Sequence, residues 1–270
     1  MENTKVLFVS QEITPYLPES EISLISRHLP QGVQELGCEI RTFMPRFGVV
    51  RERRNQLHEV IRLSGLNLII NDNDHPLIIK VASIQAAKMQ VYFIDNDDYF
   101  KRDFTITDEN GIEFDDNDER AIFFSRGVLE TTKKLRWTPD IVHCHGWFSG
   151  ITPLLIKKTL ADDPFFANAK VIYSVYNDEF SKPLDEGIIA KLGTIGVDEK
   201  DVEVLKNPDY INFTKMAIDN SDAIIQGSEN IHPEIAEYIK ESKKPFLEYK
   251  NEEEYIEAYK EFYDSLTETE

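Results

Sequence analysis

The sequence predicts an α/β fold with a mainly parallel β-sheet. Apolar, β-rich runs alternate with stretches of helical periodicity along most of the 270 residues. Several of these runs are nearly continuously apolar, which is typical of strands covered on both faces by helices. Strands separated by helices indicate right-handed crossovers and a ligand site at the carboxyl ends of the strands. The length allows one large domain or two small ones without disulfides or metals.

The first elements form a βαβ unit. A strand is expected over 5–10 and a second over 38–45, with a helix between them that Ser20 caps and Gly37 ends. Pro30 is expected to kink or split this helix. The helix is assigned from apolar residues at helical spacing: Ile22, Ile25, Leu29, Val33 and Leu36.

The next segment predicts a β-hairpin excursion with a return strand. Three strand-like runs, "LNLIIN", "PLIIKVASI" and "MQVYFIDN", surround a turn signal at "DNDH". The polar stretch that follows is expected to be an irregular loop. It ends at Asp116, which with Glu119 predicts a capping box for a helix over 120–136.

Strands and helices then alternate to the end of the chain. We expect strands over 140–146, 170–177 and 223–228, helices over 148–160 and 210–222, short helices within 184–206, and a helix that begins at Ser228. The tail is expected to be an amphipathic helix that needs a docking surface, because one stripe carries Tyr255, Ile256, Tyr259, Phe262 and Tyr263.

Composition and missing motifs exclude several functions. The net charge of −19 disfavours binding to nucleic acid and to anionic membranes, and a neutral partner is easier to accommodate. The sequence has no G-x-S-x-G elbow, P-loop or G-x-G-x-x-G fingerprint, and "FDDNDER" lacks EF-hand spacing. We therefore expect no cofactor. Cys38 and Cys144 are expected to be buried thiols, and the N-terminus carries no leader pattern, so a cytoplasmic location is expected.

Candidate site residues stand where the predicted strands end. In "HCHGW" the two histidines share one strand face, but no third ligand stands at a convincing spacing, so a metal site is disfavoured. His143 is expected to hydrogen-bond in the interior, whereas His145 and Trp147 are expected to line a sugar or nucleotide pocket. Trp147, Tyr16 and Phe100 are candidates for stacking on a sugar ring, with a core role equally expected for Phe100.

Several stretches together resemble one family, the bacterial glycogen and starch synthases, which transfer glucose from ADP-glucose to an α-1,4-glucan. They are the opening up to "FMPRFG", "VYFIDNDDYFKRDF", "DDNDERAIFFSRGVLET", "PDIVHCHGWFSGITPLLIK" and "YINFTKMAIDNSDAIIQGS", collinear over about 4–230. The resemblance implies a single Rossmann-like lobe of GT-B type, the N-terminal lobe that mostly receives the glucan acceptor. It also implies two units: a lobe over 1–245 and a closing helix over 246–270 docked on it.

The chain departs from the family pattern at the groups that would handle the donor. Pro18 stands in place of the loop lysine, and Ser20 and Glu21 replace two glycines. Leu24 stands in place of an aspartate. Gly146 and Phe148 replace the aspartate and the second histidine of the H-D-W-H segment, and Tyr176 replaces a histidine that would contact the donor sugar. Glu12, His145, Trp147 and Asn177 match the pattern.

The resemblance therefore implies a sugar site without the charged donor groups. The candidate sugar-binding residues are Glu12, Tyr16, His145, Trp147, Tyr176 and Asn177. We expect binding of α-glucan (glycogen or maltooligosaccharide) or of another protein of glycogen metabolism, with weak or no transfer by the chain alone, as in a pseudoenzyme. Two alternatives stay open: an active glucosyltransferase with a separate donor lobe or a changed donor, and a regulatory partner that binds no sugar.

Overall fold

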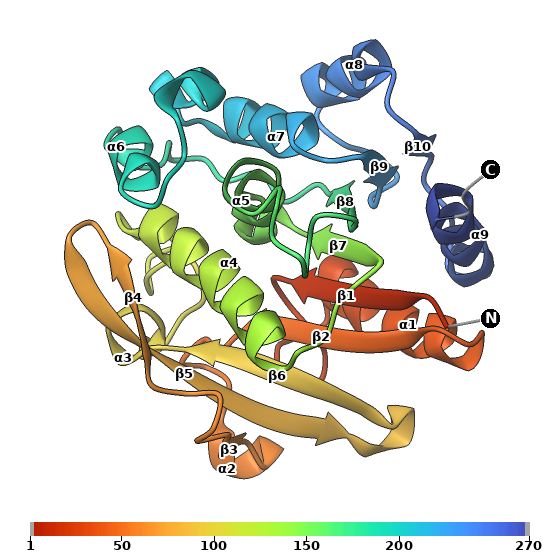
Figure 1. The fold of residues 1–270 in the computed structure, drawn as a ribbon, viewed down its shortest axis with the longest axis horizontal. Coiled ribbons are helices and arrows are strands. Elements are labelled where there is room, and N and C mark those ends of the chain that lie inside the picture. The colour runs from red at the N-terminus through yellow and green to blue at the C-terminus, as the bar shows by residue number, and fades with distance from the viewer. Residues whose placement is uncertain (1–2, 268–270) are drawn as a thin grey trace.

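The computed structural model describes residues 3–267 and confirms the α/β class with a mainly parallel sheet. One sheet runs through the molecule with helices on both faces (Figure 1). Its strand order is β10-β9-β8-β7-β1-β2-β6-β5-β3, and β4 pairs with β5 beside this path. The centre of the sheet is therefore built from the two strands of the predicted βαβ unit and the strand that contains the first three residues of "HCHGW".

Parallel pairing joins six strands that the sequence pattern predicted and one short strand, β10, that it did not. They are β1 (Lys5–Ser10), β2 (Glu39–Pro45), β6 (Met89–Asp95), β7 (Ile141–His145), β8 (Lys170–Val175), β9 (Ala223–Gln226) and the short β10 (Phe246–Leu247). The antiparallel part contains β3 (His58–Glu59), β4 (Leu66–Ile70) and β5 (Asn73–Ile84). Strands β4 and β5 are the predicted hairpin and β6 is its return strand, whereas β3 was not predicted. Asn71 and Asp72 make the turn, both with positive φ, as two-residue hairpin loops require.

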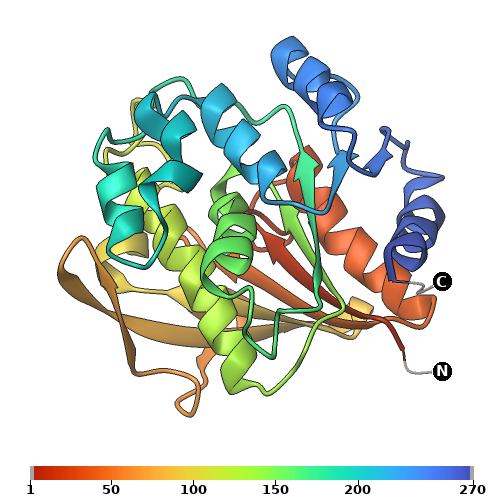
Figure 2. The same ribbon diagram turned by 45° about the horizontal axis from the view of Figure 1, so that its top comes forward.

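The helices divide between the two faces of the sheet. The elements are α1 (Glu21–Glu35), α2 (Glu52–Asn55), α3 (Asp97–Phe100), α4 (Asn117–Lys134), α5 (Ile151–Thr159), α6 (Ile188–Gly193), α7 (Tyr210–Asp219), α8 (Pro233–Ser242) and α9 (Tyr255–Thr267). Helices α4, α5 and α7 pack side by side over one face, whereas α1 and α9 lie together on the other (Figure 2). None of the helices within 3–267 is both long enough and apolar enough to cross a membrane.

Helix α1 starts as predicted and does not break. The Ser20 hydroxyl accepts the Ser23 N–H at 3.0 Å, and the Ser23 hydroxyl accepts the Ser20 N–H at 2.8 Å. Gly37 follows the helix with φ near +98°. The expected split at Pro30 is wrong: Pro30 lies inside one continuous helix. It is buried there, so packing offsets the loss of one backbone hydrogen bond.

Helix α4 starts after Asp116 as predicted, but its capping box is wrong, and so is the predicted helix start at Ser228. Asp116 precedes α4, but its side chain makes no cap and instead accepts a hydrogen bond from Arg102 at 2.7 Å. Glu119 accepts from the Tyr99 hydroxyl at 3.0 Å rather than closing a capping box. The helix expected from Ser228 begins at Pro233, because a proline at the first helical position suits the helix geometry better.

Helix α9 docks through its aromatic stripe. Tyr259 and Tyr263 are fully buried, and the Tyr263 hydroxyl lies 2.6 Å from His143 Nδ1 at the centre of the sheet. A Cβ at Gly32 of α1 would lie 2.6 Å from Ile256 Cδ1, so the close approach of the two helices requires glycine there. The amphipathic tail thus finds its surface on α1 and β7.

Candidate functional site

The candidate residues meet at the carboxyl edge of the sheet. Strands β1, β7, β8 and β9 are neighbours, so the segments that follow them converge. These segments carry Glu12, Trp147, Asn177 and Ser228. The parallel register aligns Ser10 with His145 and His145 with Ser174. The structure therefore brings the predicted strand ends together, as the open α/β architecture requires.

The two histidines of β7 are buried and neutral. His143 hydrogen-bonds in the interior as expected, with Nε2 2.7 Å from the Ser174 hydroxyl and Nδ1 facing Tyr263. His145 Nδ1 lies 2.7 Å from the Tyr176 hydroxyl. Burial lowers the pKa of His145 to about 3 and that of His143 well below its ordinary value. Neither imidazole carries charge at neutral pH.

The aromatic candidates are core residues in this structure. Tyr16 is 7 % exposed, Trp147 1 % and Phe100 0 %. Trp147 packs edge-to-face against Phe180, with ring centroids 4.8 Å apart. Neighbouring rings enclose Trp147 and His145 in this structure, and the sugar or nucleotide pocket expected at these two residues stays a prediction. Roles for Tyr16, Trp147, His145 and Tyr176 in sugar binding stay predictions, and none of them presents an exposed ring face.

Carboxylates close the N-terminus of α1. The Ser20 hydroxyl donates to Glu12 at 2.5 Å, and the Ser228 hydroxyl donates to Glu21 at 2.5 Å. Asn177 N–H donates to the Ser228 oxygen at 2.9 Å, which ties the end of β8 into the same network. A helix N-terminus is an intrinsic anion site. Here the side chains of Glu12 and Glu21 lie at this helix N-terminus, so an incoming phosphate would meet negative charge.

Asp178 is a polar residue of this edge that the sequence analysis missed. Its carboxylate accepts the Trp147 N–H at 2.7 Å and the Tyr210 hydroxyl at 3.1 Å. Burial raises the pKa of Asp178 to about 7 despite these bonds. Its position immediately after the polar end of a predicted strand was the available signal. The carboxylate thus joins the loop after β7 to helix α7.

Asp178→Asn is expected to change the pH dependence of stability. The folded pKa lies above the ordinary value, so between about pH 4 and 7 the folded state binds more protons than the unfolded state, and stability falls as pH rises. We expect the wild type to lose roughly 1–3 kcal/mol relative to the variant as pH rises through this window, with no further change above about pH 8. Urea unfolding of both proteins at several pH values measures this difference. Parallel stability curves would contradict the assignment.

An open groove lies beside the closed edge. It has a volume of about 620 Å³ and is formed by α1, the residue after β9 and the segment that leads into α9. The lining residues are Glu21, Leu24, Ile25, His28, Gly227, Tyr249, Lys250, Glu252, Tyr255 and Ile256. We call it the tail groove. Two features of the sequence analysis lie in its lining: the departures from the family pattern at Glu21 and Leu24, and the tail stripe through Tyr255 and Ile256.

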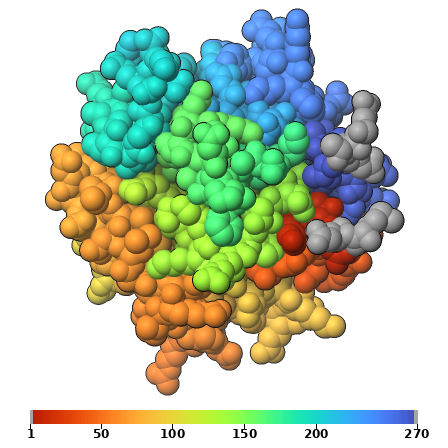
Figure 3. Space-filling model, viewed as in Figure 1, coloured from red at the N-terminus to blue at the C-terminus, as the bar shows by residue number. Residues whose placement is uncertain are grey.

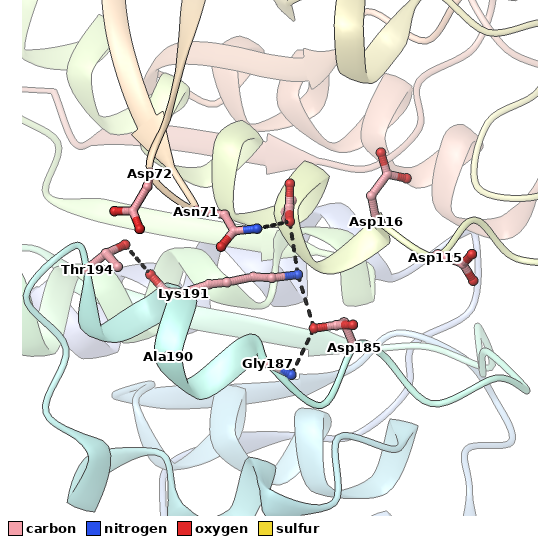
Figure 4. A pocket seen from close by; sticks show the side chains of 10 residues that line it. Asn71, Asp72, Asp115, Asp116, Asp185, Gly187, Ala190, Lys191 and Thr194 are labelled. Carbon is pink, nitrogen blue, oxygen red and sulfur yellow. Dashed lines mark hydrogen bonds and ion pairs between the residues drawn. The ribbon is translucent and has the colours of Figure 1, made fainter.

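A second cavity, of about 510 Å³, is lined by other segments of the sequence. It lies between the tip of the β4–β5 hairpin and α6 (Figure 4). These two parts lie side by side in the space-filling view (Figure 3). Lys191 fills its centre, with Nζ 2.8 Å from Asp118, 3.0 Å from Glu119 and 3.2 Å from Asp185. Burial raises the pKa of Asp118 to about 6. The lysine neutralises the acidic cluster, and within 3–267 no three His, Cys, Asp or Glu side chains are placed to hold a metal ion.

Comparison with known proteins identifies the lobe. The family model of the starch synthase catalytic domain matches residues 5–247. Glycogen synthase of Chlorobium limicola is 41 % identical over 65 % of this chain and 36 % of its own length, and that of Chlorobium luteolum is 33 % identical over 86 % and 48 %. The catalytic domain of starch synthase IV from Arabidopsis thaliana, solved with ADP and acarbose bound, superposes with a TM-score of 0.74 at 17 % identity, covering 92 % of this chain and 52 % of that one. The chain thus spans half or less of the curated relatives it matches.

Proposed function

Because the chain belongs to the starch synthase catalytic domain family, we propose that it is an α-glucan-binding lobe that transfers glucose weakly or not at all by itself. One observation supports the expectation that the chain transfers glucose weakly or not at all. The N-terminus of α1, which in an α/β fold offers N–H groups to a phosphate, is faced by Glu12 and Glu21 through their serine partners. The first strand-to-helix turn, 11–20, contains no lysine and no arginine.

Retaining glucose transfer develops negative charge on the departing diphosphate. Preorganised cationic or N–H donors stabilise that charge in a transferase. Here the turn has Pro18 and helix α1 begins with Glu21 instead, and a carboxylate raises the energy of a diphosphate beside it. An uncharged oligosaccharide meets no such repulsion. The fold neighbour was solved with acarbose as well as ADP, which supports a carbohydrate as the ligand class of this fold.

Paired calorimetric titrations test the proposal. We expect saturable heat with maltoheptaose at millimolar concentration and no saturable heat with ADP or ADP-glucose. Cellohexaose serves as the control for the α-1,4 linkage and is expected to bind more weakly. A flat maltoheptaose trace would overturn the glucan-binding role and favour a regulatory partner that binds no sugar. Saturable binding of ADP would overturn the account of the α1 N-terminus.

A further inference from the structure

The tail groove is the open cavity next to the predicted sugar site. Glu21 lines it and also accepts the Ser228 hydroxyl, which in turn accepts the Asn177 N–H. Its volume of about 620 Å³ falls within the range of ~300–1,000 Å³ usual for small-molecule sites. The groove is therefore large enough for a ligand and is linked by hydrogen bonds to the strand ends.

The groove presents aromatic surface that the strand ends lack. Tyr249 and Tyr255 are half-buried and line the cavity, in contrast to the buried Tyr16 and Trp147. Tyr255 stands edge-on to Tyr259, with ring centroids 6.0 Å apart, so a docked helix holds it in place. Burial raises the pKa of Tyr255, and its hydroxyl stays protonated at neutral pH. A ring held in this way gives a ligand a flat surface at little entropic cost.

Polar groups surround these rings with mixed charge. Glu21, Glu252 and Lys250 line the groove together with His28. Two carboxylates against one lysine disfavour a nucleotide, a phosphate or an anionic headgroup. Carboxylates, an ammonium group and phenols instead suit a neutral ligand rich in hydroxyl groups, which can both accept and donate hydrogen bonds. Apolar side chains of α1 and α9, Leu24, Ile25 and Ile256, complete the lining.

We propose that the tail groove is the α-glucan site, with Tyr249 and Tyr255 stacking on glucose rings and Glu21, Lys250 and Glu252 binding their hydroxyl groups. This inference rests on the proposed function, because it places the same ligand class at a defined location. The carbohydrate then binds between α1 and the chain segment that closes the lobe. The buried rings of Tyr16 and Trp147 at the strand ends do not line the groove.

Titration of single variants with maltoheptaose tests the location. Tyr249→Ala and Tyr255→Ala are each expected to weaken the affinity about fivefold or more, because each removes a stacking surface. Glu252→Gln is expected to weaken it less. Tyr238→Ala is the matched control: Tyr238 is a half-buried tyrosine on α8 whose hydroxyl donates to Asp219, away from the groove. Its affinity is expected to equal that of the wild type.

The outcomes separate the two proposals. Tyr255 also packs on α9, so its variant is accompanied by a melting curve. Tyr249 precedes that helix and carries the decisive comparison. A wild type that binds maltoheptaose together with an unchanged Tyr249→Ala affinity would overturn the tail groove and leave glucan binding standing. A wild type that binds no maltoheptaose would overturn both.

Discussion

A chain cut after Tyr249 is expected to melt about 5–10 °C below the intact protein. The cut removes Tyr259 and Tyr263, which are fully buried against α1 and β7. Burial of each such ring contributes roughly 1.5–3 kcal/mol, and His143 loses its partner for Nδ1 inside the core. The regained freedom of the helix offsets part of this loss, which leaves about 2–4 kcal/mol and the stated shift for a chain of this size. Thermal unfolding followed by circular dichroism measures it.

A matched pair of point variants tests the cause without deleting a helix. Tyr263→Phe removes only the hydroxyl that faces His143 and is expected to cost about 1–2 kcal/mol. Tyr238→Phe removes a hydroxyl of α8 that donates an exposed hydrogen bond to Asp219 of α7. This variant is expected to cost less than about 0.5 kcal/mol. Equal stabilities of the two variants, or an unchanged melting temperature after truncation, would contradict the proposed role of the tail.

The division of the chain into a lobe over 1–245 and a closing helix over 246–270 remains a proposal. The short strand β10, at Phe246–Leu247, extends the sheet beside β9, so the boundary falls inside a segment paired with the lobe. A cut after Tyr249 keeps this strand and removes α9 together with residues 250–254, which lead into it. The truncated chain is therefore the fair test of whether the helix closes the lobe.

The sequence pattern predicted most strands and helices because apolar spacing and capping residues are local features of the chain. Near-continuous apolar runs placed β1, β7 and β8, and the capping serine at position 20 placed the start of α1. The failures came where tertiary contacts override local preference. Asp116 could cap α4, but Arg102 binds its carboxylate. Ser228 could start a helix, but Glu21, 207 positions away in sequence, accepts its hydroxyl. A single sequence does not show such long-range partners.

The candidate site was predicted in position more closely than in detail. The strand order brings the predicted residues to the carboxyl edge of the sheet, and the expectation of a parallel sheet is enough to predict this. Whether Trp147 faces solvent or the core depends on Phe180 and other rings from distant segments, and the sequence pattern around "HCHGW" fits either case. Asp178 was not predicted because its partners come from distant segments: the backbone N–H of Trp147 after β7 and the hydroxyl of Tyr210 on α7.

The second large expected effect concerns catalysis. Loss of one preorganised donor at a developing charge typically lowers the rate by about a hundredfold or more. In this chain the turn before α1 offers no lysine, and carboxylates face the helix N-terminus. Several such losses at one site lead us to expect less than about one hundredth of the rate of the full-length glycogen synthase of Chlorobium limicola. Binding of the acceptor is expected to remain, since it needs no positive charge.

The most direct measurement is the incorporation of labelled glucose from ADP-glucose into glycogen by the pure chain. The full-length glycogen synthase of Chlorobium limicola is assayed in parallel, and glycogen co-sedimentation is measured on the same samples. The account predicts that the chain sediments with glycogen and incorporates no label above the one-hundredth level. Sustained elongation of glycogen at a rate near that of the full-length enzyme would contradict it.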